Sequence, residues 1–263
     1  MGALGIGPLL AGCLAQWAPY PLTLPYLVMV ALGAVALIGV AAAPETGTPV
    51  PRAAAQSRPA GPARRVRLPV PAAGATIAAF AASGLFAALS GLILATTLHQ
   101  TSHALSGAAL FVVFTAGVVS QLATNRLRSS RVLALGTFSM ITGLVLLVVA
   151  VRLSTPSLAL FLIGGALIGA GAGAVYKGTT GIVLEATAPE NRVAMTSALV
   201  IAVFLGLSVP VIGAGIALDQ GASVPNTVVG FAVLVALAVS VSGWALLGRR
   251  PAGVQHAAEP VSR

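Results

Sequence analysis

Residues 144–151 read LVLLVVAV, and the longer stretch 132–151 around them contains no Asp, Glu, Lys or Arg. The run lacks the alternation of polar and apolar positions that a membrane β-barrel strand of about ten residues shows. An α-helix rises about 1.5 Å per residue, so a run of about 20 residues can cross roughly 30 Å of hydrocarbon. Lipid offers no hydrogen-bond partners, and we therefore expect a helix, which satisfies its own backbone.

The composition of the whole chain agrees with that stretch. Of the 263 residues, 57% are hydrophobic and only 7% are charged, and the mean hydropathy is +1.00. A soluble domain carries about 25% charged residues, because its surface faces water. The composition therefore excludes a soluble enzyme and indicates a protein that lies mostly in lipid.

Other uncharged runs are long enough to cross a membrane. The first, 1–43, has room for two crossings and divides at Ala18-Pro19-Tyr20-Pro21, because each proline removes a backbone donor and pushes its preceding residue out of helical geometry. We predict an all-α polytopic membrane protein with eight transmembrane helices. The predicted spans lie near 1–17, 23–43, 71–97, 105–124, 132–151, 157–184, 193–218 and 226–247.

The basic residues predict the orientation of these spans. Twelve of the fourteen Lys and Arg fall on one side, in the segments 44–70, 125–131 and 249–263 and at Arg192, against Arg152 alone on the other. Lys and Arg are retained on the cytoplasmic side. We therefore expect a multi-pass protein of the inner membrane with both termini in the cytoplasm.

The segment 44–70 divides the chain into two groups of helices. It is rich in Pro, Ala and Arg without apolar periodicity, which predicts a flexible, basic cytoplasmic linker. Two helices of a partial N-terminal bundle precede it (1–43), six helices of a C-terminal bundle follow it (71–248), and a cytoplasmic tail (249–263) ends the chain. The arginines lie beside spans and lack interleaved aromatic residues, so we expect them to face lipid headgroups and not nucleic acid.

The six-helix group divides again into two sets of three. Because three is odd, the second set enters the membrane from the side opposite to the first. Inverted repeats of this kind build many secondary transporters and place the substrate site at their interface.

Two motifs carry a resemblance to a known family. The first span contains GIGPLLAG (5–12), with Gly7, Pro8 and Gly12, and has Ala3 and Ala11 where a fuller pattern has glycines. The sequence resembles the antiporter motif in the fifth helix of the major facilitator superfamily. The second span ends in Pro44-Glu45-Thr46, as the sixth helix of that family often does.

The second motif is GVVSQLATNRLR (117–128), which resembles the superfamily's signature loop between helices eight and nine. Gly117 and the basic residues Arg126 and Arg128 fit that signature, whereas Gln121 stands in place of its acid and Thr124 in place of its second glycine. In order and spacing the chain matches helices five to twelve of the twelve-helix plan.

The resemblance implies a secondary active transporter that exports a small organic solute by proton antiport and alternating access. It also implies four further helices on the N-terminal side, so we expect a fragment or a chain that pairs with a second chain. The alternative is a truncated or accessory membrane protein without transport activity of its own.

Lys177 is the most informative single residue, since a lysine inside a span costs about 2.5–3.5 kcal/mol on insertion scales. One interpretation makes it a cavity cation that binds substrate together with Tyr176 and Thr180. The other is a lysine that extends to the cytoplasmic interface with Glu185 nearby. In either case we expect polar neighbours, Thr179 and Thr180 among them, to compensate the charge.

Further residues suggest gating, capping and packing. We expect Glu185 and Arg192 to border a cytoplasmic gate, and Thr187-Ala188-Pro189-Glu190 to form a capping box. Three glycines at a spacing of four predict close helix packing or a sliding surface. They are Gly165, Gly169 and Gly173.

The sequence indicates neither an enzyme nor a metal site. It contains no zinc-protease, nucleophile-elbow or phosphate-loop pattern, and we expect no cofactor. His99 and His103 lie four apart, but the residues between them predict a turn and no third ligand lies close by in sequence. We therefore expect interfacial histidines.

Overall fold

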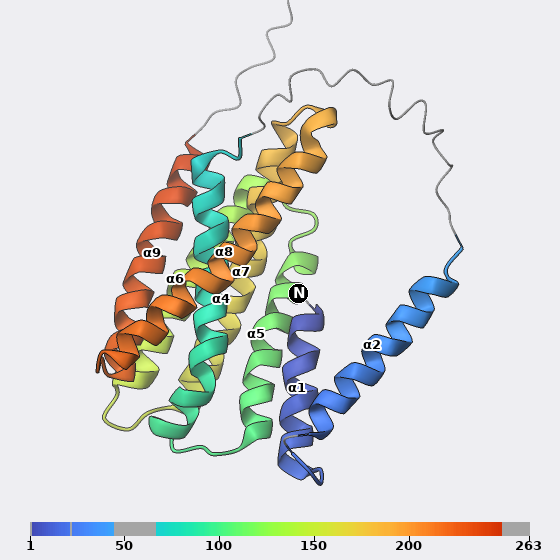
Figure 1. The fold of residues 1–263 in the computed structure, drawn as a ribbon. Helices are drawn as coiled ribbons and strands as arrows, with labels where there is room; N and C mark the ends of the chain where they lie inside the picture. The colour runs from blue at the N-terminus through green and yellow to red at the C-terminus, as the bar shows by residue number, and fades with distance from the viewer. Residues whose placement is uncertain (1, 22, 45–66, 249–263) are drawn as a thin grey trace, which may run out of the picture.

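The computed structural model describes residues 2–21, 23–44 and 67–248, and these are helical with no strand among them. This confirms the predicted all-α class. The described part holds eight α-helices and one 3₁₀-helix (Figure 1). They are α1 (Gly2–Trp17), α2 (Leu24–Ala42), α4 (Val70–Thr96), α5 (His103–Ala123), α6 (Ser129–Arg152), α7 (Leu158–Glu185), η1 (Pro189–Asn191), α8 (Arg192–Asp219) and α9 (Val224–Leu247).

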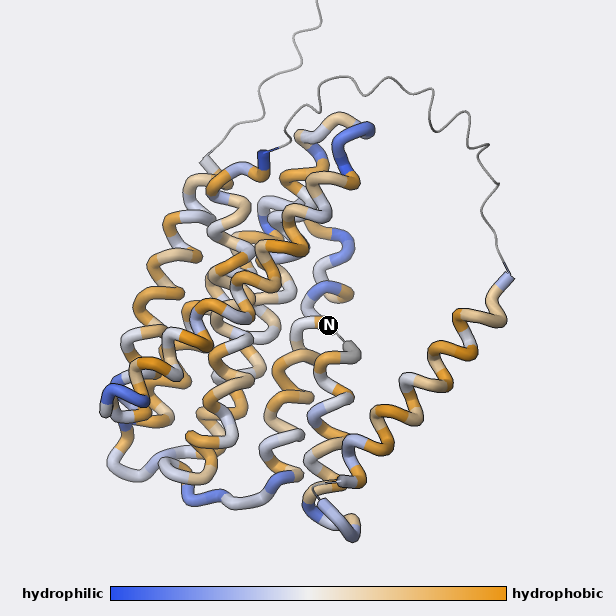
Figure 2. The backbone as a smooth tube through the Cα atoms, in the orientation of Figure 1, coloured by the Kyte–Doolittle hydropathy of each residue, from blue (hydrophilic) through white to orange (hydrophobic). Residues whose placement is uncertain are grey.

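Seven of the described helices are long and apolar enough to cross a membrane, which makes the chain a multi-pass membrane protein. The exception is α1, because its 16 described residues reach about 24 Å, less than the roughly 30 Å of a hydrocarbon core. The predicted span at 1–17 is therefore a helix, and its described residues are shorter than a full crossing. Figure 2 shows apolar residues along the helices and polar ones at the turns.

Polar residues explain where helices begin earlier or later than the uncharged runs suggested. Ser102 caps α5, since its hydroxyl accepts a hydrogen bond from the backbone N–H of Leu105 at 3.2 Å. The hydroxyl of Ser157 accepts from the N–H of Leu160 in the same way at the start of α7. Helix α6 begins at Ser129, three residues before the predicted span, and so includes Arg131 in its first turn.

The six helices α4 to α9 alternate in direction. One end of this bundle, here called the linker end, contains the starts of α4, α6 and α8 and the ends of α5, α7 and α9 (Figure 1). The opposite end is called the far end. Consequently the first triplet, α4 to α6, enters the bundle at the linker end and the second, α7 to α9, enters it at the far end, the inverted arrangement expected for two triplets.

In each triplet the first helix packs against the second and third helices of the other triplet. The first helix of one triplet, α4, packs against α8 and α9, the second and third helices of the other. In the same way α7 packs against α5 and α6, and α4 and α7 also pack against each other. The two triplets are therefore interleaved around a central pair, α4 and α7, which contains the most buried spans in the described chain.

Glycines allow the backbones of α7 and α6 to come into direct contact. Three glycines of α7 and two of α6 line this contact, and a Cβ on four of them would lie within 2.7 Å of a backbone nitrogen on the neighbouring helix. On the fifth, Gly164, a Cβ would lie 3.0 Å from backbone atoms of α6. All recur at a spacing of seven, which is the period of left-handed helix packing. They are Gly164, Gly171 and Gly178 on α7 and Gly136 and Gly143 on α6.

The glycines at a spacing of four face elsewhere on α7. A Cβ on Gly169 would collide with the carbonyl oxygen of Val113, and one on Gly173 with that of Gly117, both on α5. A Cβ on Gly165 would meet the ring of Phe86 on α4 at 2.5 Å. Helix α7 therefore has two glycine faces, and the predicted small-residue stripe is the one that packs on α5 and α4.

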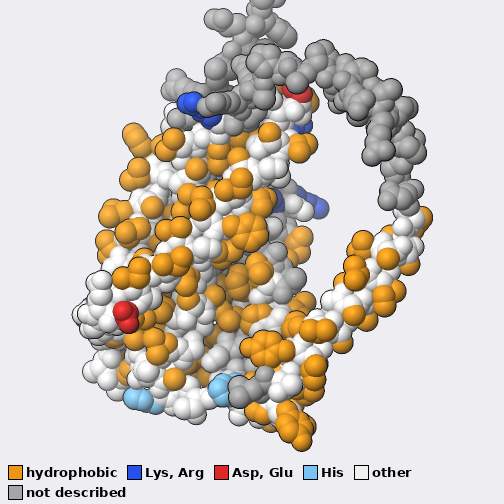
Figure 3. All heavy atoms as spheres, in the orientation of Figure 1, with side chains coloured by type: hydrophobic (Ala, Val, Ile, Leu, Met, Phe, Trp, Pro, Cys, Tyr) orange, Lys and Arg blue, Asp and Glu red, His pale blue; other side chains and the backbone are white. Residues whose placement is uncertain are grey.

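The N-terminal pair contacts the bundle through one helix. Helix α1 packs along α5, whereas α2 packs mainly against α1 and none of its described residues is buried (Figure 1). Figure 3 shows a face on which most side chains are apolar, as expected for a surface in lipid. The predicted linker, apart from 44 and 67–70, and the tail lie outside the described residues, as do Glu45 and Thr46.

Replacing Gly169 with Leu should destabilise the fold by about 3 kcal/mol, because the new side chain would meet the α5 backbone, which cannot rotate away. The matched control is Gly215→Leu on α8, where an added Cβ meets nothing within 4 Å. Thermal unfolding in detergent measures both variants. Equal melting temperatures for the two would show that α5 and α7 are not in backbone contact.

Candidate functional site

The side chain of Lys177 binds the end of a neighbouring helix. Its Nζ atom donates hydrogen bonds to the backbone carbonyl of Gln121 and to Oδ1 of Asn125, the latter at 2.9 Å, and lies 3.5 Å from Oγ1 of Thr124. Gln121 lies in the last turn of α5, and Thr124 and Asn125 directly follow it. The lysine is half-buried and lies in the last third of α7, eight residues before that helix ends at Glu185.

This position explains how a lysine is tolerated inside an apolar helix. The last carbonyls of a helix carry partial negative charge, and a cation there stabilises by about 0.3–1 kcal/mol, or up to about 2 when partly buried. The expected compensation by neighbours on α7 is wrong. Tyr176 packs edge-on against Phe80 at 5.5 Å between ring centroids, and the hydroxyls of Thr179 and Thr180 are buried without a hydrogen-bond partner.

Glu185 does not pair with Lys177. Its Oε1 accepts a hydrogen bond of 2.7 Å from the hydroxyl of Ser129, the first residue of α6. The glycine one turn earlier, Gly181, makes room for that serine, because a Cβ there would overlap its Oγ. The carboxylate therefore lies at the amino end of α6, where the partial charge is positive.

Together these two residues hold the turn between α5 and α6, residues 124–128. Helix α7 places a cation at the negative end of α5 and an anion at the positive end of α6. Lys177 and Glu185 are eight residues apart, or about 12 Å along α7. The polar cluster at this turn is here called the turn clamp, and it consists of Lys177, Asn125, Thr124, Ser129 and Glu185 together with the carbonyl of Gln121.

The other residues of the loop motif lie around the turn clamp. Arg126 is exposed on the turn, and Arg128 precedes α6 in extended conformation without capping it. The carbonyl of Gly117 is the group that abuts Gly173. Arg192 lies apart from the turn clamp at the start of α8, where its Nε donates to the carbonyl of Thr187 at 3.4 Å.

The antiporter-like motif forms the contact between α1 and α5. A Cβ on Gly12 would lie 2.6 Å from the carbonyl oxygen of His103, and one on Gly107 would overlap the carbonyl of Pro8. Gly7 faces open space instead. At the far end Oε1 of Gln16 accepts from the backbone N–H of His103 at 2.9 Å, so α1 also caps α5.

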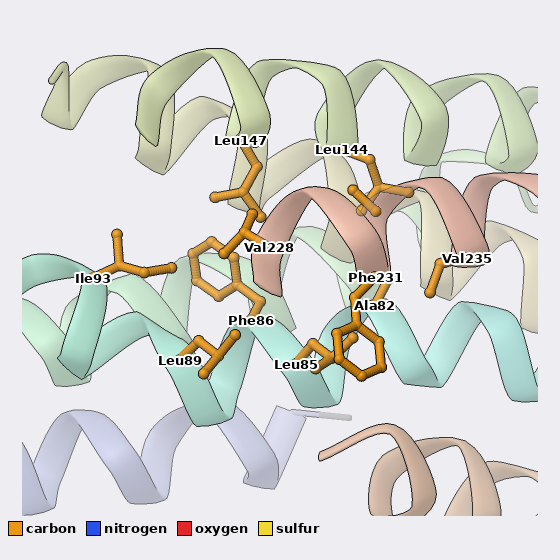
Figure 4. A pocket seen from close by; sticks show the side chains of 11 residues that line it. Ala82, Leu85, Phe86, Leu89, Ile93, Leu144, Leu147, Val228, Phe231 and Val235 are labelled. Atoms are coloured by element: carbon orange, nitrogen blue, oxygen red, sulfur yellow. The ribbon is translucent and has the colours of Figure 1, made fainter. Parts of the chain in front are cut away.

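A small cavity lies between α4, α6 and α9 (Figure 4). Its volume of about 20 Å³ is enough for one water, but its lining is apolar, so we expect it to be dry. Phe86 lines it and stacks on Phe161 with ring centroids 4.9 Å apart. Neither Lys177, Tyr176 nor Thr180 lines this cavity, and their role in binding a substrate stays a prediction.

The structure corrects or confirms two smaller expectations. The capping box at 187–190 is absent, because the hydroxyl of Thr187 donates back to the carbonyl of Val183 at 2.6 Å and a 3₁₀-turn follows. His99 lies in the turn before α5 with φ of 52°, so the two histidines do not share a helix face, as expected. No cluster of three metal-ligating side chains occurs in the described ranges.

Sequence reasoning missed Asn125, Ser129 and Gln16. They are ordinary polar residues in or beside turns, and no spacing in the sequence links Asn125 to Lys177 or Gln16 to His103. The seven-residue spacing of Gly164, Gly171 and Gly178, in contrast, is visible in the sequence and would have predicted the contact with α6.

Comparison with models of known families, with curated proteins and with solved structures found no match to this chain.

Replacing Lys177 with Met should lower stability by about 1–3 kcal/mol, since it leaves the acceptors at the end of α5 without their donor. Hydrogen exchange of residues 121–130 should become faster, and thermal unfolding should shift downward. Arg126→Met, which removes an exposed arginine from the same turn, is the control. If exchange in this segment were the same in both variants, the turn clamp would not hold the turn.

Proposed function

We propose that this chain is a secondary active transporter of the major facilitator type, which moves a small organic solute by alternating access. The observation that carries the proposal is the interleaved pair of inverted triplets. Many secondary transporters are built from such repeats, and they expose a site near the bilayer midplane to each side in turn. The six-helix bundle has the inverted directions and the exchanged contacts that this mechanism requires.

The helix contacts suit a rocking motion. On its faces toward α5 and α6, helix α7 meets the neighbouring backbone with few interlocking side chains. Smooth surfaces of this kind let packed helices shift by small sliding steps. The turn clamp would then stabilise the state in which the linker end is closed, because it joins α7 of one triplet to α5 and α6 of the other.

A solute needs polar groups along its path, and the linker half of the bundle holds several. Four buried threonine hydroxyls on the described helices have no hydrogen-bond partner. Buried polar groups are normally paired, so unpaired ones call for an additional partner. A solute or water that enters between the triplets would supply one. The four are Thr76 on α4, Thr137 on α6, and Thr179 and Thr180 on α7.

The proposed direction is efflux driven by proton antiport, and its support is the likeness of GIGPLLAG (5–12) to the antiporter motif. Among the carboxylates of the described chain, Glu185 is the candidate for proton coupling. Protonation would remove its negative charge from the amino end of α6 and so weaken the turn clamp. We place the chain in an inner membrane with both termini in the cytoplasm, on the distribution of arginines.

An accessory role is the second candidate, and α2 favours it. This helix is apolar enough to span a membrane, yet within the described chain it packs mainly against α1 and buries none of its residues. Such a helix would fit a chain that pairs with a second chain, or with four further helices, through the N-terminal pair.

Spin-label distances between α5 and α8 separate the two candidates. One pair is placed at the linker end, Leu122 with Val193, and one at the far end, His103 with Gln220, in a chain with Cys13 replaced by Ala. Alternating access predicts two distance populations for each pair, with opposite changes at the two ends between acidic and alkaline buffer. A single unchanging population at both ends would favour the accessory role.

Replacing Thr179 with Val should reduce flux several-fold without lowering stability, because the hydroxyl is unpaired in the folded protein and its removal costs no hydrogen bond. Transport of the dye ethidium into everted membrane vesicles is the readout. Thr142→Val, at a half-buried position on α6 where the hydroxyl donates to the carbonyl of Phe138 in its own helix, is the control and should leave flux unchanged. Undiminished efflux by the Thr179 variant would remove this threonine from the path.

A further inference from the structure

An apolar groove runs between α6 and α9 on the outside of the bundle. It has a volume of about 230 Å³, and it is lined only by apolar side chains. Leu144 and Ala232 are buried and form its floor, whereas Val145, Val149 and Val233 are exposed along its open side. On α6 it extends from Ile141 to Val149, about 12 Å along the helix axis.

The far end of the groove carries a positive charge. Arg152 ends α6, and its Nη2 donates a hydrogen bond of 2.7 Å to Oδ1 of Asn226 in the first turn of α9. Both residues are exposed and lie one helical turn beyond Val149 and Val229, which line the groove. The arginine therefore bridges the two helices directly above the groove.

Most hydrogen-bond donors of the Arg152 guanidinium have no partner among the described residues. A guanidinium has five N–H donors, and Arg152 makes a single hydrogen bond to Asn226 and no ion pair with any described residue. The amino end of α9 adds partial positive charge at the same place. Arg152 is also the sole Lys or Arg at the far end among the described residues.

We propose that this surface binds one phospholipid of the surrounding membrane, with an acyl chain in the groove and an anionic phosphate on Arg152. The groove is larger than the apolar cavity of about 150 Å³ that binds benzene in another protein, and its lining gives water no partner. A free anion would use the arginine but leave the groove empty. Only an amphiphile with a charged head and an apolar tail occupies both parts.

Bound lipid would join α6 to α9, the third helices of the two triplets. The groove follows the seam between these helices, and Arg152 and Asn226 close the seam at the far end. The inference is independent of transport, since it rests on the groove and on the charge above it.

The test uses the full chain, stripped of lipid in detergent and titrated with dioleoyl-phosphatidylglycerol. Native mass spectrometry counts the lipids retained per chain, and thermal unfolding measures the stabilisation that binding brings. We expect one tightly held phosphatidylglycerol, and weaker retention of the zwitterionic dioleoyl-phosphatidylcholine. Glycerol phosphate, the head without the chains, should give no stabilisation.

Two variants separate the head from the tail. Arg152→Gln should weaken phosphatidylglycerol binding roughly tenfold and abolish the preference over phosphatidylcholine, because a charge-assisted hydrogen bond is lost. Val145→Trp should fill the groove and release both lipids. The controls are Arg131→Gln at the linker end and Val241→Trp on an exposed face of α9, which should retain the lipid.

Three results would overturn the proposal. If Arg131→Gln weakened binding as much as Arg152→Gln, the attraction would be a general effect of charge. Stabilisation by glycerol phosphate equal to that by the lipid would indicate an anion site alone. A dimer that persists in place of bound lipid would show that a second copy of the chain covers the groove.

Discussion

The structure depends on how closely helix backbones can approach one another in lipid. Between apolar helices in a bilayer there is no hydrophobic driving force, because lipid tails are as apolar as the side chains. Association then relies on van der Waals contact, which is greatest where no side chain intervenes. The glycine faces of α7 supply that contact on two sides, and through them the two triplets become one bundle.

The charged side chains that form hydrogen bonds within the described bundle act at helix ends. Lys177 binds the end of α5, and Glu185 binds the start of α6 across the same turn. Gln16 caps the start of α5, and Arg152 joins α6 to α9. In lipid an unsatisfied backbone group costs several kcal/mol, so helix ends are where such residues stabilise most. Only 7% of the residues are charged, and the described helices fold around these groups with no buried ion pair among residues 2–21, 23–44 and 67–248.

Much of the fold could be predicted from the sequence, because span length and charge are local properties. The uncharged runs gave every described helix of the bundle within a few residues, and the odd number of helices per triplet gave the inversion. Contacts between side chains on different helices could not be predicted in this way. Lys177 was recognised as unusual, but its partners lie more than fifty residues away at the end of α5, and only the three-dimensional packing brings them together. The unpaired threonines were equally invisible, since a hydroxyl's partner depends on the neighbouring helix.

Disulfide formation between α6 and α7 tests the central contact most directly. A Cβ on Gly164 would lie 3.4 Å from that of Leu146, close to the separation of about 3.8 Å found in disulfides. With Cys13 replaced by Ala, the pair Leu146→Cys and Gly164→Cys should cross-link when membranes are treated with an oxidant, whereas Leu146→Cys with Gly215→Cys should not. If the first pair stayed reduced in a folded, membrane-inserted chain, α7 would not pack on α6 through its glycines.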